Sequence, residues 1–263
     1  MNIVLVHGFL GFREKFGIEY FRGVAEHLTA KGYKVIAPIL DPTRGIEYRG
    51  GQLRVQINAA LANGSLDAAQ KTHIFAHSMG GLDSRWMLSP ANPSRIQAPI
   101  RSLTTISTPH RGSPIADLVD APEKFAPFGH PDPDLFQSAL AALGISLDGL
   151  RNLTTASCKQ FNATYTDNQA VAYFSVAGIG RPGFRPTCSL FLLFYRYISA
   201  LTGEANDGLV TLSSAQWGQF DQNTWPADHA DEVGTNLDNI LAPTPFIPWL
   251  AKYDLMVSAV EPL

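Results

Sequence analysis

The sequence lacks any hydrophobic run long enough to cross a bilayer. Its longest strongly apolar segment, residues 190–195, ends at Arg196, whereas a transmembrane helix needs roughly 20 such residues. Basic residues are few and scattered: 20 Lys and Arg stand against 23 Asp and Glu, for a formal net charge of −3. We therefore expect neither a membrane-spanning segment nor the concentrated positive charge of a nucleic-acid-binding surface.

Cysteine is nearly absent, since only Cys158 and Cys188 occur in 263 residues. Their spacing fits no short metal-binding or redox motif, and the sequence leaves open whether they form a disulfide or stay reduced. The N-terminus has no basic segment followed by an apolar stretch and a cleavage site. We therefore expect no secretory signal peptide, which leaves a cytoplasmic location and leaderless secretion both open.

The remaining composition is that of a folded globular chain, with 45% apolar and 16% charged residues. The length suits a single α/β domain over residues 1–263, and no repeat or linker divides it. Strands are expected at residues 3–6, 34–39, 72–76, 102–106, 170–177 and 209–212, and helices at about 20–28, 52–62, 80–88, 190–201 and 249–257. Continuously apolar strands that alternate with helices predict a mostly parallel sheet with helices on both faces.

The clearest functional motif is Ala76-His77-Ser78-Met79-Gly80, between the strand expected at 72–76 and the next helix. A nucleophilic serine on a sharp strand-to-helix turn needs small residues two positions before and after it, because the strained backbone packs against neighbouring strands. Ala76 and Gly80 are small, although glycine is more common at the first position. The motif alone is frequent in ordinary loops, but its place after a buried strand predicts that Ser78 is a nucleophile.

A serine nucleophile needs a base and an acid, and in α/β-hydrolases these follow the serine in the order acid, then histidine. Histidines before or beside Ser78 are excluded, His110 has no assigned acid before it, and His130 lies in a proline-rich segment. His229 remains, 22 residues after Asp207. Taken singly, these residues are typical of a solvated loop and a surface turn, but together with Ser78 they predict a catalytic triad.

An acyl-transfer site also needs two N–H groups that stabilise the negative charge of the oxyanion. One is expected to be the amide of Met79, directly after the nucleophile and at the start of a helix. The other is expected to be the amide of Phe9, because the glycine in His7-Gly8-Phe9 lets the loop after the first strand turn toward the serine.

Seven motifs follow one another between residues 4 and 233: VLVHGFLGF (4–12), YF (20–21), RGGQL (49–53), AHSMGG (76–81), STPHRGS (107–113), NDGLV (206–210) and DHADEV (228–233). This succession resembles the bacterial true lipases of the Proteus and Pseudomonas type, in the α/β-hydrolase superfamily. The resemblance implies an α/β-hydrolase fold without its first two strands, activity on acylglycerol esters and a mobile lid. It also implies Ser78 as nucleophile, Asp207 as acid, His229 as base, and Phe9 and Met79 as oxyanion donors.

Lipases of this type usually hold a structural calcium ion between two carboxylates, one of which matches Asp231. The second should lie about twenty residues before Asp207, yet residues 168–203 contain no Asp or Glu. Calcium takes several oxygen ligands, usually with more than one carboxylate. We therefore predict no metal site, and the predicted chemistry needs no cofactor.

Residues 113–159 interrupt the alternation of strands and helices and are predicted to form a lid insertion. Five prolines are followed by an expected helix at 134–143, which has Asp134 as N-cap and Gly144 as stop. Its apolar side chains include Leu135, Phe136, Leu140 and Leu143. The helix is either permanent core or a mobile lid, and the flanking prolines and glycines favour a lid that covers Ser78 when closed and contacts a lipid–water interface transiently when open.

These observations predict a serine carboxylester hydrolase, a lipase that cleaves acylglycerol esters through an acyl-enzyme. Two alternatives remain open at this stage. A short-chain carboxylesterase or thioesterase would use the same triad with a different acyl pocket. A non-catalytic binding protein could keep the α/β-hydrolase fold and use the pocket for recognition only.

Overall fold

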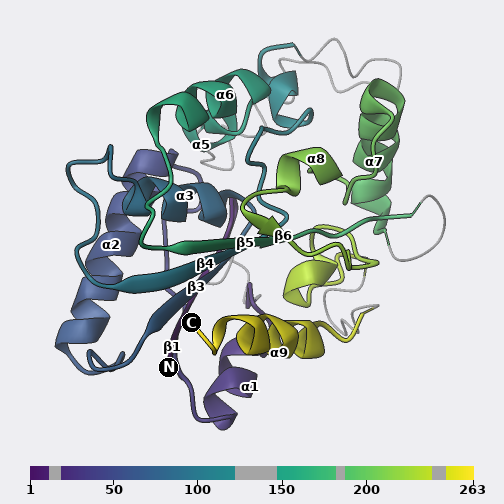
Figure 1. Cartoon of the computed structure of the whole chain (residues 1–263). Coiled ribbons are helices and arrows are strands. Elements are labelled where there is room, and N and C mark those ends of the chain that lie inside the picture. The colour runs from purple at the N-terminus through teal and green to yellow at the C-terminus, as the bar shows by residue number, and fades with distance from the viewer. Residues whose placement is uncertain (12–18, 122–146, 182–186, 239–246) are drawn as a thin grey trace.

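A six-stranded parallel sheet forms the centre of the computed structural model, which describes residues 1–11, 19–121, 147–181, 187–238 and 247–263 (Figure 1). The strand order is β2-β1-β3-β4-β5-β6, and every neighbouring pair is parallel. The strands are β1 (Asn2–Val6), β2 (Lys34–Ile36), β3 (Thr72–His77), β4 (Ile100–Ile106), β5 (Ala172–Val176) and β6 (Gln219–Phe220).

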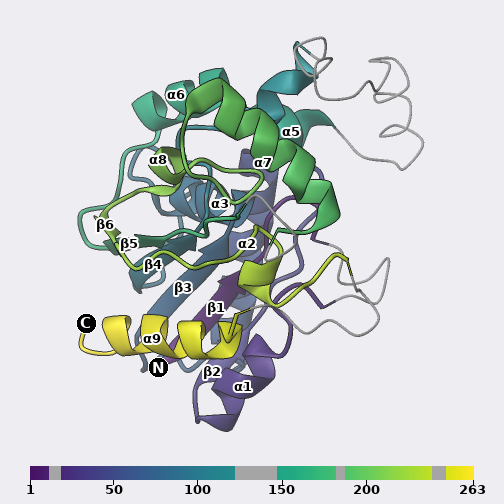
Figure 2. The ribbon, with the colours of Figure 1, turned by 90° about the vertical axis from the view of Figure 1, so that its right-hand side faces the viewer.

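Helices cover both faces of the sheet, as the alternation of elements predicts (Figures 1 and 2). Val4 and Val6 of β1 pack in one core cluster with residues of α2 (Ile46–Ala62) and α3 (Met79–Leu88). Ile3 and Leu5 pack in a second cluster with residues of α1 (Val24–Ala30) and α9 (Trp249–Val260). Because successive side chains of a strand point to opposite faces, β1 is buried on both sides, which explains its uninterrupted apolar sequence.

The expected strand at residues 209–212 is wrong. The Thr211 side chain instead accepts a hydrogen bond from the Ser214 amide and caps α8 (Leu212–Ala215), so the short apolar run leads into a helical turn. The sixth strand is β6, which has only two residues and no alternating pattern to reveal it. The other helical segments are η1 (Ala116–Val119), α5 (Leu147–Asn152), α6 (Thr155–Thr164), α7 (Ser189–Thr202) and η3 (Asp231–Val233).

Only the two ends of the predicted insertion are described, as η1 and as α5 with the start of α6. The helix expected at 134–143, with Leu135, Phe136, Leu140 and Leu143, lies outside the described residues. Cys158 and Cys188 are both buried and free, which answers the question of a disulfide. Within the described part of the chain, no helix is long and apolar enough to cross a bilayer.

Candidate active site

Ser78 lies at the turn between β3 and α3, where the backbone adopts φ 54° and ψ −131°. A positive φ is uncommon for a residue other than glycine and needs support from its surroundings. The Ser78 amide donates to the Ile106 carbonyl at 2.9 Å, and the Thr108 hydroxyl donates to the Ser78 carbonyl at 2.7 Å. Groups at the end of β4 and just beyond it therefore hold the serine in its strained conformation.

The small residues around this turn are required by close backbone contacts. A Cβ atom on Gly80 would lie 2.5 Å from the Val6 carbonyl oxygen. Ala76 is completely buried and pairs with Val6 on one side and Thr105 on the other. The parallel strands thus accommodate a methyl group two residues before Ser78, but leave no room for any side chain two residues after it.

Asp207 and His229, which are 22 residues apart, are brought together in a buried pair. His229 Nδ1 lies 2.7 Å from Asp207 Oδ2, and the His229 amide donates to the Asp207 carbonyl at 3.0 Å. The other carboxylate oxygen, Oδ1, accepts the amides of Leu209 and Val210 at 2.8 and 2.7 Å. A carboxylate that accepts two amide protons at Oδ1 is set to accept the Nδ1 proton at Oδ2, so that Nε2 becomes the basic nitrogen of His229.

The loop after β1 lies directly against Ser78. A Cβ atom on Gly8 would be 2.6 Å from the Ser78 Cβ and 3.1 Å from its Oγ. This glycine therefore permits the approach of the segment that contains Phe9. Met79 is buried and begins α3, so its amide is at the N-terminus of that helix. Both predicted oxyanion donors thus belong to backbone segments that adjoin the serine.

Arg49, which was not predicted as a site residue, binds this loop through hydrogen bonds to its backbone. Its guanidinium is fully buried, donates to the His7 carbonyl at 2.7 Å and to the Gly8 carbonyl at 3.3 Å, and forms an ion pair with Asp83 at 2.8 Å. Burial raises the pKa of Asp83 to about 6, although the charge of Arg49 acts in the opposite direction. The RGGQL motif marks Arg49, but nothing local to it reveals contacts with residues 42 and 34 positions away.

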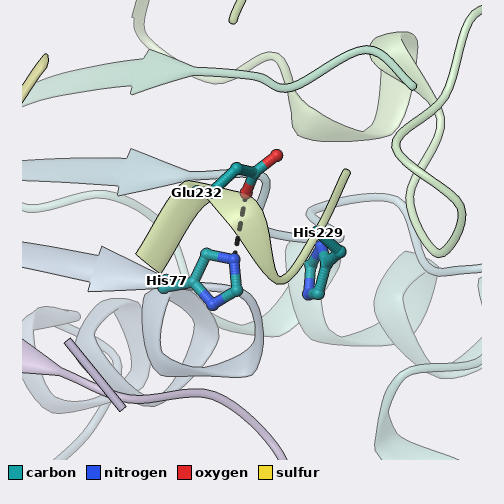
Figure 3. A group of neighbouring side chains, drawn as sticks. All are labelled: His77, His229 and Glu232. Carbon is teal, nitrogen blue, oxygen red and sulfur yellow. Dashed lines mark hydrogen bonds and ion pairs between the residues drawn. The ribbon is translucent and has the colours of Figure 1, made fainter. Parts of the chain in front are cut away.

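Two further side chains beside His229 were not predicted as site residues. The rings of His77 and His229 have centroids 4.4 Å apart, and His77 Nε2 bonds with Glu232 Oε2 at 3.0 Å (Figure 3). Burial and the neighbouring His229 lower the pKa of His77 well below its usual value, so this histidine is neutral. Burial and the nearby charge of Asp207 raise the pKa of Glu232.

Three side chains that could together bind a metal ion lie beside one another in the described part of the chain. Ligand-type atoms of His77, His229 and Glu232 lie within 4.8 Å of one another, and no such group in the described residues includes Asp231. Both nitrogens of His77 and both carboxylate oxygens of Glu232 already form hydrogen bonds, and His229 Nδ1 is bonded with Asp207. The nearby Asp228 carboxylate accepts the amides of Cys188, Ala230 and Asp231. This group of three side chains is therefore not the calcium site that the resemblance implies, whose one matching carboxylate is Asp231, and the absence of calcium stays a prediction.

The strand order and the turn at Ser78 define an α/β-hydrolase, and known proteins place the chain more closely. No family model matches it. It is 31% identical over 264 residues to a triacylglycerol lipase of Pseudomonas fragi, covering 88% of this chain and 87% of that one. It is 35% identical over 222 residues to triacylglycerol lipase 2 of Saccharomyces cerevisiae, covering 82% of this chain but only 62% of the yeast protein.

Solved structures agree with these relatives. A Bacillus licheniformis lipase in its mature form superposes with a TM-score of 0.66 at 25% identity, covering 87% of this chain and 84% of that one. The chain therefore belongs to the triacylglycerol lipase family. It is a hydrolase of the lipase and esterase class, in agreement with the resemblance seen in the sequence.

Proposed function

We propose that this chain hydrolyses acylglycerol esters with Ser78 as nucleophile, His229 as general base and Asp207 as the residue that orients it. The observation that carries this proposal is the buried pair of His229 Nδ1 and Asp207 Oδ2 at 2.7 Å. The ring centroid of His229 lies 4.4 Å from that of His77, which directly precedes Ser78 in its strained strand-to-helix turn. The pair of His229 and Asp207 directs the basic Nε2 away from Asp207 and makes it available to a hydroxyl group.

The reaction has two stages. In the first, His229 Nε2 takes the Ser78 proton while Oγ attacks the ester carbonyl, and the amides of Phe9 and Met79 stabilise the oxyanion. Collapse of the tetrahedral intermediate breaks the ester bond, and His229 returns the proton to the leaving alcohol. In the second stage, His229 takes a proton from water, whose oxygen attacks the acyl-enzyme, and the carboxylic acid leaves as Ser78 recovers its proton.

Acylglycerols are proposed as substrates because both relatives described above are named triacylglycerol lipases. A short-chain esterase or thioesterase would share the triad and differ in acyl preference. A binding protein without catalysis would not need a buried acid to orient a histidine. The helix expected at 134–143 is proposed as a lid that brings the enzyme into transient contact with a lipid–water interface.

The test is hydrolysis of p-nitrophenyl esters of increasing acyl length by the wild type, Ser78→Ala, His229→Ala and the double variant. Residues that act as one unit are not additive, so all three variants should fall to a similar residual rate, roughly 10⁶-fold below the wild type. Ser89→Ala is the control, because this serine is also buried but its hydroxyl donates to the Thr166 carbonyl and accepts the Ala91 amide. Retention of most activity by Ser78→Ala would refute the assignment.

The lid is tested with a medium-chain ester across its solubility limit. Leu140→Asp should reduce activity on emulsified ester much more than activity on dissolved ester, because only the emulsion offers an interface to the apolar face of the helix. Leu255→Asp is the matched control, since Leu255 is 65% exposed on α9. Equal losses on both forms of substrate would mean that Leu140 belongs to the core.

A further inference from the structure

Beside His229, a series of hydrogen bonds joins the side chains of Tyr20, His77, Glu232 and Ser107. The Tyr20 hydroxyl lies 2.7 Å from His77 Nδ1, and His77 Nε2 lies 3.0 Å from Glu232 Oε2. The Ser107 hydroxyl donates to Glu232 Oε1 at 2.6 Å and accepts the Gly178 amide at 3.0 Å. His77, Glu232 and Ser107 are each at most 1% exposed. Every polar side-chain atom of His77 and Glu232 therefore has a partner.

The protonation states of Tyr20 and His77 determine how these hydrogen bonds are arranged. Burial raises the pKa of Tyr20, so its phenol keeps its proton, and burial lowers the pKa of His77, so its ring is neutral. A neutral imidazole has one N–H and one lone pair, so it donates to one neighbour and accepts from the other. The ring of His77 is thus held at both nitrogens, between Tyr20 and Glu232, and cannot rotate without breaking two hydrogen bonds.

These hydrogen bonds connect the three segments that carry the proposed catalytic groups. His77 directly precedes Ser78, and Glu232 lies in η3, three residues after His229. The Tyr20 oxygen lies against the loop of Phe9, because a Cβ atom on Gly8 would be only 2.7 Å from it. Residues 20, 77 and 232 are far apart in the sequence, so these hydrogen bonds set the relative positions of segments that no local structure joins.

The ring of His77 also supports His229 directly. The two rings have centroids 4.4 Å apart and an interplanar angle of 44°, and the His77 ring is held by its hydrogen bond with Glu232 (Figure 3). Apolar side chains of similar volume would fill this space without the cost of burying a carboxyl group and an imidazole. The polar set is therefore better explained by the orientation that it enforces than by its contribution to stability.

We propose that Tyr20, His77 and Glu232 are positioning residues, which fix the ring of His229 and the Phe9 loop relative to Ser78. This inference rests on the proposed function. None of the three touches the reacting atoms in the mechanism given above, so their effect reaches the reaction only through His229 and through the oxyanion loop. Displacement of such groups by even about 1 Å can reduce a rate roughly 100-fold.

The experiment measures kcat and KM for a dissolved p-nitrophenyl ester with Tyr20→Phe, Glu232→Gln and the double variant. Each single substitution preserves the shape of the side chain and should lower kcat roughly 10- to 100-fold, with KM within about twofold of the wild type. Because both residues act through the same ring, the double variant should lose no more than the more severe single variant. Labelling of Ser78 by a fluorophosphonate should slow in parallel.

Two matched controls separate orientation from stability. Tyr173→Phe removes a phenol that accepts the Asn168 amide, and Ser102→Ala removes a buried β4 hydroxyl that bonds with His73. These variants should lower the thermal midpoint about as much as the test variants and leave kcat unchanged. The positioning role is overturned if Tyr20→Phe and Glu232→Gln keep kcat within twofold of the wild type, or if their losses are additive and follow the thermal midpoint as in the controls. Activity in Ser78→Ala would instead overturn the proposed function itself.

Discussion

Replacement of Arg49 by methionine should destabilise the protein and impair the oxyanion loop at the same time. The Arg49 Nε and Nη2 groups both lie 2.8 Å from Asp83 Oδ2, and both residues are fully buried. Oδ1 of Asp83 has no hydrogen-bond partner among the described residues. Arg49→Met would therefore leave a buried carboxylate without its counter-ion, and breaking a buried pair in this way costs about 3–5 kcal/mol.

The effect of pH on this variant has a definite sign. The folded-state pKa of Asp83 is raised to about 6, so protonation at low pH favours the folded state and this contribution is lost as the pH rises through about 6. Removal of the positive charge of Arg49 raises this pKa further. The loss of unfolding free energy, measured by urea denaturation, should therefore be larger at pH 7 than at pH 5.

The double variant Arg49→Met/Asp83→Leu separates stability from activity. Removal of both charges should recover most of the lost unfolding free energy, because well-packed apolar residues can replace a buried ion pair at little cost. Activity should stay at least tenfold low, because the carbonyls of His7 and Gly8 have lost their guanidinium donor and the Phe9 loop is no longer fixed. Recovery of both quantities would refute the role of Arg49 in the loop. A cost below about 1 kcal/mol for Arg49→Met would refute the buried-charge argument.

Three further results are expected. Burial lowers the pKa of His73 to about 4. The unfolding free energy, measured with urea, should therefore fall by on the order of 2 kcal/mol as the pH drops from 6.5 toward 4. His73→Leu should reduce this loss. Chelation by EDTA should leave activity and thermal midpoint nearly unchanged, because residues 168–203 offer no second carboxylate, and a large drop reversed by calcium would show that the protein binds calcium. Gly8→Ala should abolish most activity, because the added Cβ would collide with Ser78. Gly51→Ala is the control: its added Cβ has no atom within 4 Å, so it should leave activity intact and stabilise α2 by about 1 kcal/mol.

The sheet and its helices could be predicted because their signals are local. Buried parallel strands favour uninterrupted apolar residues, and residues 3–6 of β1 show them plainly. The steric demand of the turn at Ser78 is also local, since Gly80 and Ala76 lie two residues away on either side. Two predictions of strands failed because the local signal misleads or is missing. Residues 209–212 are apolar enough for a strand, but Thr211 among them caps α8, and β6 is too short to show any period.

The surroundings of the site could not be predicted, because they depend on partners that are distant in the sequence. Chain order excludes His77 as the base, but it does not reveal that His77 bonds with Glu232, 155 residues away. The same holds for Arg49, whose partners lie in α3 and in the loops that follow β1 and β2. A catalytic order of Ser, Asp and His can be recognised from residue types alone, whereas the groups that orient it are recognised only by the atoms they contact. Substitutions at His77, Glu232 and Arg49 therefore test the structure more severely than substitutions in the triad, since the sequence alone assigns these three residues no effect on the reaction.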